Sequence, residues 1–204
     1  MTPSSLAGPL LTDLYEITMA AGYWRYDIRD RATFSVFVRN PENKRNYFVA
    51  AGLETLLQEL ESYRFRDEDL TYLQSLQLFE AGFLDALQQL RFTGDVHALP
   101  EGTLFFPEEP VIEITAPIIE AQLIETLVLN TIGIATLIAT KAARCIHAAG
   151  GRPLVDFALR RTHGSDAGDQ VARSTYIAGF GATSNLRAGQ RFGHRFCNCR
   201  HHPG

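Results

Sequence analysis

Hydrophobic and polar positions in the first part of the chain follow two different periods. Apolar residues recur every three or four positions in residues 9–25, which predicts an opening helix. Residues 32–41 alternate polar and apolar side chains up to Asn40-Pro41, as a strand does when it enters a turn. A short polar segment separates this strand from a second one at residues 46–50, so the pattern predicts a hairpin.

The middle of the chain holds helices first and strands after them. Residues 51–90 return to the helical period and are expected to form three helices, the second capped by Asp67. Residues 92–115 are predicted to form strands, two of them on either side of the turn between Pro107 and Pro110.

The most apolar segment of the chain begins after Pro117 and is predicted to be helical. Asn130 and Gly133 are expected to divide it into two helices, and the second should end at Gly150-Gly151.

A strand–helix–strand rhythm begins only near the end of the chain. Residues 153–159 are a predicted strand, residues 166–180 a helix, and residues 181–185 a second strand-to-loop turn. Such a rhythm is typical of a parallel sheet, so the fold class is predicted to be α/β. The expected regions are an α+β domain (1–116), bridging helices (117–152), the start of an α/β domain (153–193) and a tail (194–204).

Composition and charge exclude several classes of partner. The 204 residues carry a formal net charge of −4, which argues against a nucleic-acid surface or an anionic-membrane surface built on bulk charge. The apolar window between Glu125 and Lys141 is too short and too rich in threonine to span a bilayer, so it is interpreted as a buried helix. The N-terminus lacks a signal-peptide pattern and the three cysteines form no disulfide framework, which together predict a cytoplasmic protein.

Arg160 and Arg161, which follow the apolar run VDFAL, are the first candidates for chemistry. A fork of guanidinium donors at the end of a buried strand suits a phosphate or a carboxylate ligand. An internal ion pair with one of the 23 acidic residues is the competing interpretation. The spacing alone leaves both open.

A resemblance to a known family extends from Pro9 to Gly193. Five stretches carry it in this order: LLTDLYEITMAAGYW (10–24), FVRNPENKRNYFVAAGLE (37–54), ALPEGTLFFPEEPVIEITAPIIEAQLIET (98–126), DFALRRTHG (156–164) and STYIAGFGATSNLRAGQRFG (174–193). In these stretches the chain resembles the N-terminal part of the nicotinate phosphoribosyltransferases.

The resemblance implies an enzyme that joins nicotinate to phosphoribosyl pyrophosphate, giving nicotinate mononucleotide and pyrophosphate on the salvage route to NAD. It further implies ATP hydrolysis through a phosphorylated histidine, with Mg²⁺ and ATP as a co-substrate but no tightly bound cofactor. The implied assembly is a homodimer with shared active sites. The implied fold is an N-terminal α/β domain followed by an irregular α/β barrel, of which this chain would hold the start.

The same resemblance assigns substrate-binding roles to three residues. Tyr15 matches a tyrosine that reaches the pyridine site of the partner subunit, Phe157 an aromatic on the other face of the ring, and Arg160 a phosphate contact. Two aromatic faces around a flat heterocycle add about 0.5–1.5 kcal/mol beyond area burial. The structural alternatives are a half-buried core tyrosine and a phenylalanine in a strand core. We expect Tyr15 to be incompletely buried, and Arg160 to face a concave site from a strand end without a carboxylate partner.

Four neighbouring residues are further candidates, each with a structural alternative. Arg161 contacts phosphate or pairs internally, and His163 contacts phosphate or lies in solvent. Thr183 and Ser184 hydrogen-bond the substrates or cap a turn.

The end of the chain departs from the family pattern. The family continues with a Gly-Thr-x-Ala-His-Ser motif that carries the phosphorylated histidine, whereas this chain reads HRFCNCRHHPG. Cys197, Cys199, His201 and His202 lack the usual zinc spacing, so neither a metal site nor a catalytic residue is predicted there. A frameshifted or truncated gene is the favoured explanation of this tail.

The length of the chain supports the same expectation. A closed eight-fold α/β barrel takes about 250 residues, far more than the stretch after Pro153 supplies. The chain is therefore expected to be inactive alone. The alternatives are a related transferase that uses nicotinamide, and a non-catalytic chain that pairs with a full-length subunit.

Overall fold

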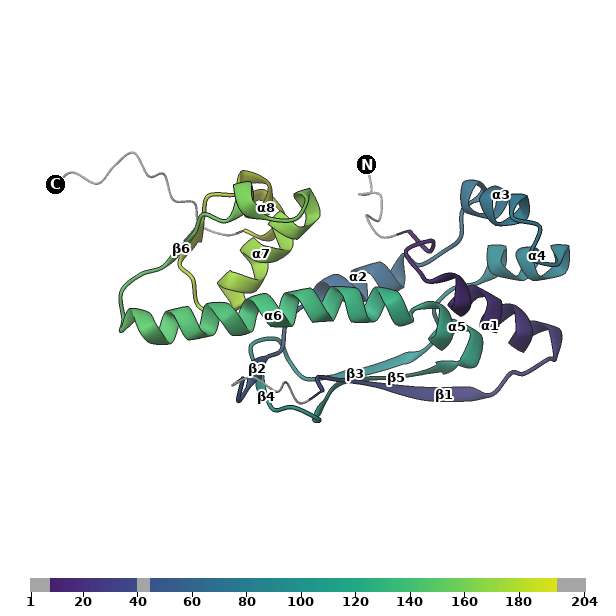
Figure 1. Cartoon of the computed structure of the whole chain (residues 1–204), viewed down its shortest axis with the longest axis horizontal. Helices are drawn as coiled ribbons and strands as arrows, with labels where there is room; N and C mark the ends of the chain where they lie inside the picture. The colour runs from purple at the N-terminus through teal and green to yellow at the C-terminus, as the bar shows by residue number, and fades with distance from the viewer. Residues whose placement is uncertain (1–7, 40–44, 194–204) are drawn as a thin grey trace. The chain divides into compact units, whose positions relative to one another are not determined.

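A computed structural model describes residues 8–39 and 45–193, and Figure 1 shows their helices and strands. The predicted tail lies outside the described residues, as do the four Cys and His residues in it. The chain divides into two compact units built from interleaved segments. Unit 1 comprises the described residues of Met1–Phe37, Glu54–Ala98 and Pro110–Thr131, and unit 2 those of Val38–Leu53, Leu99–Glu109 and Ile132–Gly204. This interleaving differs from the contiguous regions that the sequence pattern suggests.

Unit 1 places helices around an antiparallel sheet. Its elements are α1 (Leu14–Arg25), β1 (Arg31–Phe37), α2 (Leu53–Glu61), α3 (Asp67–Ser75), α4 (Ala81–Gln89), β3 (Asp95–Ala98), β5 (Pro110–Pro117) and α5 (Ile118–Leu123). Strand β5 is central and pairs antiparallel with β1 and with β3 (Figure 1). Ile112, Ile114 and Ala116 of β5 are buried, so the central strand supplies the apolar face of the sheet.

Unit 2 is built on two short pairs of strands. Its elements are β2 (Phe48–Val49), β4 (Leu104–Phe105), α6 (Glu125–Ala149, which begins in unit 1), β6 (Val155–Asp156), the 3₁₀ turn η1 (Leu159–Arg161), α7 (Ser165–Ile177), β7 (Ala182–Thr183) and α8 (Leu186–Phe192). Strands β2 and β4 are antiparallel, whereas β6 and β7 are parallel and are joined through α7. Val49 packs with Ala135 and Ala139 of α6 in the core of this unit.

The hairpin predicted between residues 32–41 and 46–50 is wrong. Strand β1 instead pairs with β5 over seven residues, where Thr33 and Thr115 hydrogen-bond across the strands at 2.8 Å. Strand β2 pairs with β4, because Phe48 is fully buried and packs on the ring of Phe105 at 5.5 Å between centroids. Non-local packing of apolar side chains therefore outweighs the short connection.

The predicted break of the apolar helical segment at Asn130 and Gly133 is also wrong. The break falls at Ile124, between α5 and α6. Gly133 lies inside α6, and a β-carbon at this position would meet no other atom. A helical glycine costs about 1 kcal/mol relative to alanine, which the burial of neighbouring apolar side chains offsets. The helix ends where predicted, at Gly150 and Gly151, which both have positive φ.

Two smaller differences concern the ends of elements. The strand predicted over residues 153–159 is limited to β6, and the two arginines lie in η1 rather than at a strand end. Helix α3 begins at Asp67, so that residue is not its cap. The carboxylate of Asp69 accepts the backbone N–H of Arg66 at 2.8 Å instead.

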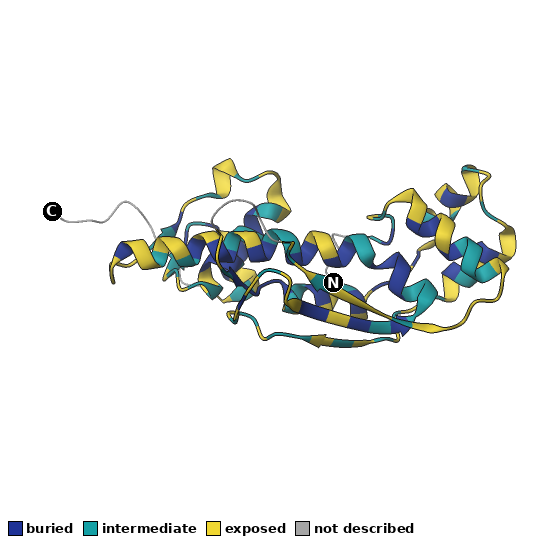
Figure 2. Cartoon of the chain, turned by 60° about the horizontal axis from the view of Figure 1, so that its bottom comes forward, coloured by how far each residue is buried: buried dark blue, intermediate teal, exposed yellow. Residues whose placement is uncertain are grey.

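The α/β class is confirmed by the mixture of helices with the parallel β6–α7–β7 unit, and the described residues contain no closed barrel. Figure 2 shows buried and exposed residues alternating along the helices. Among the described residues, α6 is the one helix long and apolar enough to cross a membrane, and half of its most apolar window is buried. A core helix of a soluble protein shares that length and composition.

Candidate functional site

A cavity of about 620 Å³ in unit 2 contains several of the predicted site residues. Its walls come from α6, from the segment that follows β6, and from α7. Phe157, Arg161 and His163 line it together with Lys141 and Cys145. The volume is in the range of small-molecule sites, and apolar walls with a few polar groups are typical of them.

The carboxylate of Asp156 fixes the turn that presents Phe157. This buried side chain accepts the hydroxyl of Thr183 at 2.8 Å and the backbone N–H of Ala158 at 2.9 Å. Its backbone carbonyl accepts the N–H of Ser184 at 2.9 Å. The bond from Ala158 turns the chain back on the side chain of Asp156 after β6 ends. Phe157 is therefore 41% exposed on the cavity wall and not in a strand core.

Basic side chains lie on the wall of the same cavity. Lys141 comes from α6, and Arg161 and His163 come from the turn before α7. Helix α7 starts at Ser165 after Gly164, whose φ is 108° and which gives the helix no side-chain cap. Uncapped N–H groups at a helix start favour a negative ligand. The arrangement therefore suits a flat ring that carries, or lies beside, anionic groups.

The structure separates the two adjacent arginines. Arg161 lines the cavity, whereas Arg160 does not. Both are exposed, and neither forms an ion pair within the described part of the chain. The internal salt bridge considered for Arg161 is therefore absent from this part. The expected position of Arg160 at a strand end is wrong, because the turn set by Asp156 places it in η1.

Thr183 and Ser184 lie outside the residues that line this cavity. Thr183 is fully buried, and its hydroxyl donates to Asp156 and accepts the N–H of Asn185 at 3.1 Å. This geometry favours the turn-fixing alternative for Thr183.

Tyr15 belongs to unit 1 and meets a different set of polar groups. Its side chain is 46% exposed, which confirms the expectation that it is not sealed in its own unit. Its hydroxyl donates to Glu125 at 2.8 Å, and the amide of Gln122 donates to the same carboxylate at 3.0 Å. The hydrogen bond to this carboxylate raises the pKa of Tyr15 to about 12.

The residue next to Tyr15 anchors the start of α1. Glu16 is completely buried, and its carboxylate accepts the hydroxyls of Thr12 and of Thr126. The orientation of Tyr15 is therefore set on both sides, by Glu125 through its hydroxyl and by Glu16 through the backbone.

Comparison with known proteins decides the family. Residues 10–133 match the model of the nicotinate phosphoribosyltransferase (NAPRTase) N-terminal domain. The chain belongs to the nicotinate phosphoribosyltransferase family. It is 51% identical over 186 residues to a nicotinate phosphoribosyltransferase of Mycobacterium tuberculosis, covering 91% of this chain and 40% of the relative. It is 46% identical over 184 residues to the Bacillus subtilis enzyme, covering 90% and 38%.

A solved structure of the same family agrees with the fold. The human nicotinic acid phosphoribosyltransferase superposes with a TM-score of 0.85 at 38% sequence identity, covering 92% of this chain and 38% of the human chain. The chain thus spans about two fifths of the length of the nicotinate phosphoribosyltransferases that it matches.

Sequence reasoning missed the residues that hold the family's candidate side chains in place. Glu125 and Gln122 were visible only as polar interruptions of an apolar helical segment, and such interruptions often mark buried hydrogen bonds. Asp156 stood inside an apolar run, which is the same signal. Lys141 was treated only as a charge that limits an apolar window, yet it lines the cavity.

Proposed function

We propose that this chain carries ring-binding and phosphate-binding elements of a nicotinate phosphoribosyltransferase, an activity of NAD biosynthesis. The observation that carries the proposal is the single cavity in which the exposed ring of Phe157 lies with Arg161 and Lys141. The family membership supports the choice of nicotinate as the ring and of phosphoribosyl pyrophosphate as the anionic donor.

The chemistry fits these side chains. The ring nitrogen of nicotinate forms a bond to C1 of the ribose, and the bond from C1 to the pyrophosphate oxygen breaks with its electron pair leaving on pyrophosphate. Phe157 would hold the flat ring by stacking. Arg161 and Lys141 would neutralise the departing pyrophosphate, which stabilises the transition state more than the ground state.

Tyr15 has its place in the same proposal as a ring contact across a homodimer. Its exposure leaves the ring of the tyrosine accessible, and Glu125 fixes its direction.

ATP would act as a co-substrate in the cytoplasm. The described residues hold no group of three or more His, Cys, Asp or Glu that could bind a metal. Mg²⁺ would arrive bound to the pyrophosphate of the donor.

Binding of pyrophosphate tests the proposal directly. We expect the chain to bind pyrophosphate by calorimetry, and Arg161→Gln to weaken this binding by about tenfold or more, because a charge-assisted hydrogen bond is lost. Arg160→Gln is the matched variant, because it removes the same charge from the neighbouring residue. The resemblance assigns the phosphate contact to Arg160, whereas the cavity lining assigns it to Arg161, so the two variants decide between these assignments. Equal binding by the wild type and both variants would refute the phosphate site.

An activity assay tests how much of the reaction the 204 residues perform. We expect no formation of nicotinate mononucleotide from nicotinate, phosphoribosyl pyrophosphate and Mg²⁺, with or without ATP, because the sequence contains no Gly-Thr-x-Ala-His-Ser motif. Turnover that disappears in Arg160→Ala or Arg161→Ala would show a working enzyme and overturn this expectation.

A further inference from the structure

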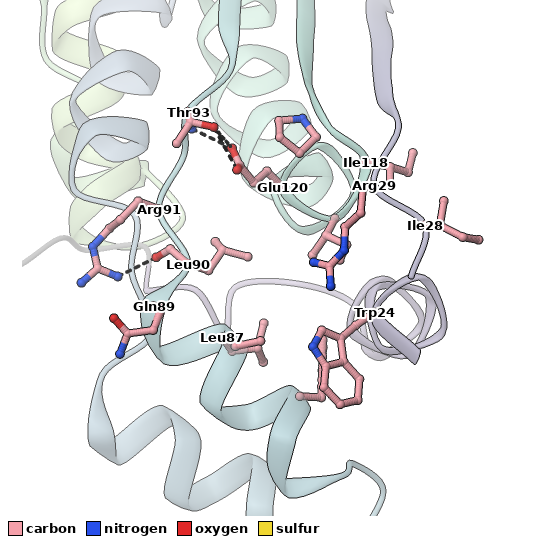
Figure 3. Close-up of a pocket in the computed structure, with 14 residues that line it drawn as sticks. Trp24, Ile28, Arg29, Leu87, Gln89, Leu90, Arg91, Thr93, Ile118 and Glu120 are labelled. Carbon is pink, nitrogen blue, oxygen red and sulfur yellow. Dashed lines mark hydrogen bonds between the residues drawn. The ribbon is translucent and has the colours of Figure 1, made fainter. Parts of the chain in front are cut away.

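Unit 1 contains a second cavity, of about 600 Å³, which shares no lining residue with the cavity of unit 2. Figure 3 shows it between α1 with the segment that follows it, α4, the segment after α4, and the start of α5. Trp24, Leu87 and Ile118 give it apolar walls, and the buried Phe83 also lines it. An apolar cavity of this size accepts a ring system larger than a single pyridine.

Some polar groups of this cavity already have hydrogen-bond partners within the chain. Glu120 is used, because its carboxylate accepts the backbone N–H of Thr93 at 2.6 Å and the hydroxyl of Thr93 at 3.0 Å. Arg91 is used in part, since it turns back to the carbonyl of Leu90 at 2.6 Å (Figure 3). Neither side chain is therefore the main polar contact that a ligand would meet.

Arg29 and Trp24 carry N–H groups that have no acceptor within the described part of the chain. Figure 3 shows the guanidinium of Arg29 pointing into the cavity on the side of Trp24. Its Nε donates to Asp27 at 2.7 Å in an exposed pair, while its two terminal nitrogens have no partner in the described part of the chain. The half-buried indole N–H of Trp24 likewise donates to no group among the described residues. Both donors face a cavity that is also lined by Gln89, Arg91, Thr93 and Glu120 and is otherwise apolar.

We propose that this cavity binds aromatic carboxylates, with the ring against Trp24, Leu87 and Ile118 and the carboxylate on the terminal nitrogens of Arg29. A planar guanidinium matches a carboxylate with two parallel hydrogen bonds, and the indole N–H adds a third donor. A neutral ring would leave the donors unpaired, and an anion without a ring would leave the apolar walls in water. The site is independent of the proposed function, because it uses other residues in the other unit.

The only tryptophan of the chain gives a direct readout of this cavity. We would titrate the ¹⁵N-labelled chain with 1-naphthoate and follow the indole N–H cross-peak of Trp24. The expected result is a saturable shift of this peak. The neutral analogue 1-naphthamide should bind at least about tenfold more weakly, because it cannot form the charge-assisted pair.

Three variants separate the site from non-specific adsorption. Arg29→Gln should weaken 1-naphthoate by about tenfold, whereas Arg25→Gln, on α1 but outside the cavity lining, should leave binding unchanged. Ala86→Leu should abolish the shift by filling the cavity while keeping every charge. The amide spectrum of each variant checks that it is folded. Absence of a saturable shift, equal binding of acid and amide, or folded Arg29 and Ala86 variants that bind like the wild type would overturn the proposal.

Discussion

In unit 1 the candidate side chain Tyr15 stands on a twelve-residue helix beside a sheet whose strands pair over up to seven residues. In unit 2 the candidate cavity borders a pair of parallel strands with two residues each. The backbone ladder that orders unit 1 is nearly missing there. Side-chain bonds replace it, since Arg173 binds Glu101, Asp156 binds Thr183, and Asp169 binds Asn185. Unit 2 should therefore be the unit that is more sensitive to the loss of a single polar side chain.

The ion pair between Arg173 and Glu101 gives the largest expected effect. It has two bonds of 2.7 and 2.6 Å, and the side chains are only 12% and 18% exposed. Arg173→Met should destabilise the protein by about 2–4 kcal/mol, because it leaves a largely buried carboxylate without its cation. Chemical denaturation with hydrogen exchange should place this loss in unit 2.

The control for this pair lies in unit 1. Arg31 binds Asp95 at 2.8 Å, but both side chains are exposed. Arg31→Met should change stability by no more than about 0.5 kcal/mol. A loss as large as that of Arg173→Met would remove the difference between the units.

The buried hydroxyl of Thr183 gives the next effect. Thr183→Val keeps the shape but removes the donor to Asp156, and should cost about 1–2 kcal/mol in the free energy of unfolding. Ser184→Ala, at the neighbouring half-buried position, should cost less than about 0.5 kcal/mol. If Thr183→Val were neutral for stability yet weakened pyrophosphate binding, its assigned role would change from structural to substrate-binding.

Acid should weaken unit 2 through Glu101. Burial alone would raise the pKa of Glu101, but the hydrogen bonds and charge of Arg173, with the N–H of Gly52, hold it below its usual 4.5. Because the pKa is lower in the folded state, ionised Glu101 stabilises the fold above pH 4.5. This stabilisation is lost as the pH falls through the folded-state pKa. The decline in stability as the pH falls below 4.5 should be shallower in Glu101→Gln. An identical decline in wild type and variant would contradict the assignment.

The smallest effect on stability is expected at Tyr15, where the measurable change is in the pKa of the hydroxyl. Its pKa should be about 12 by ¹³C NMR of labelled tyrosine, and Glu125→Gln should bring it down toward the usual 10. Because the pKa is raised in the folded state, the protonated hydroxyl of Tyr15 stabilises the fold fully below pH 10, and this stabilisation is lost as the pH rises toward 12. Because the ring is 46% exposed, the change in unfolding free energy should be small. A pKa near 10 in the wild type would show that Glu125 does not hold the hydroxyl.

Local patterns allowed most helices and the late strand–helix–strand unit to be predicted from the sequence. Strand partners were not predictable, since β1 meets β5 across roughly eighty residues and no local period encodes that register. Family motifs pointed to Phe157 and the arginines, but only the bond from Ala158 to Asp156 shows why Phe157 leaves the strand and Arg161 lines the cavity. Tyr15 was found by motif, whereas its partner Glu125 lies 110 residues away and needed the fold.

The interleaved order of the two units has a consequence for synthesis on the ribosome. The N–H of Val49 finds its acceptor in Thr140, 91 residues later. At about 5–20 residues per second, that acceptor is made roughly 5–20 s after Val49. During this delay the nascent chain exposes Phe48 and Val49, two residues that are fully buried once unit 2 has formed. Chaperones at the exit tunnel are therefore expected to bind this segment during synthesis.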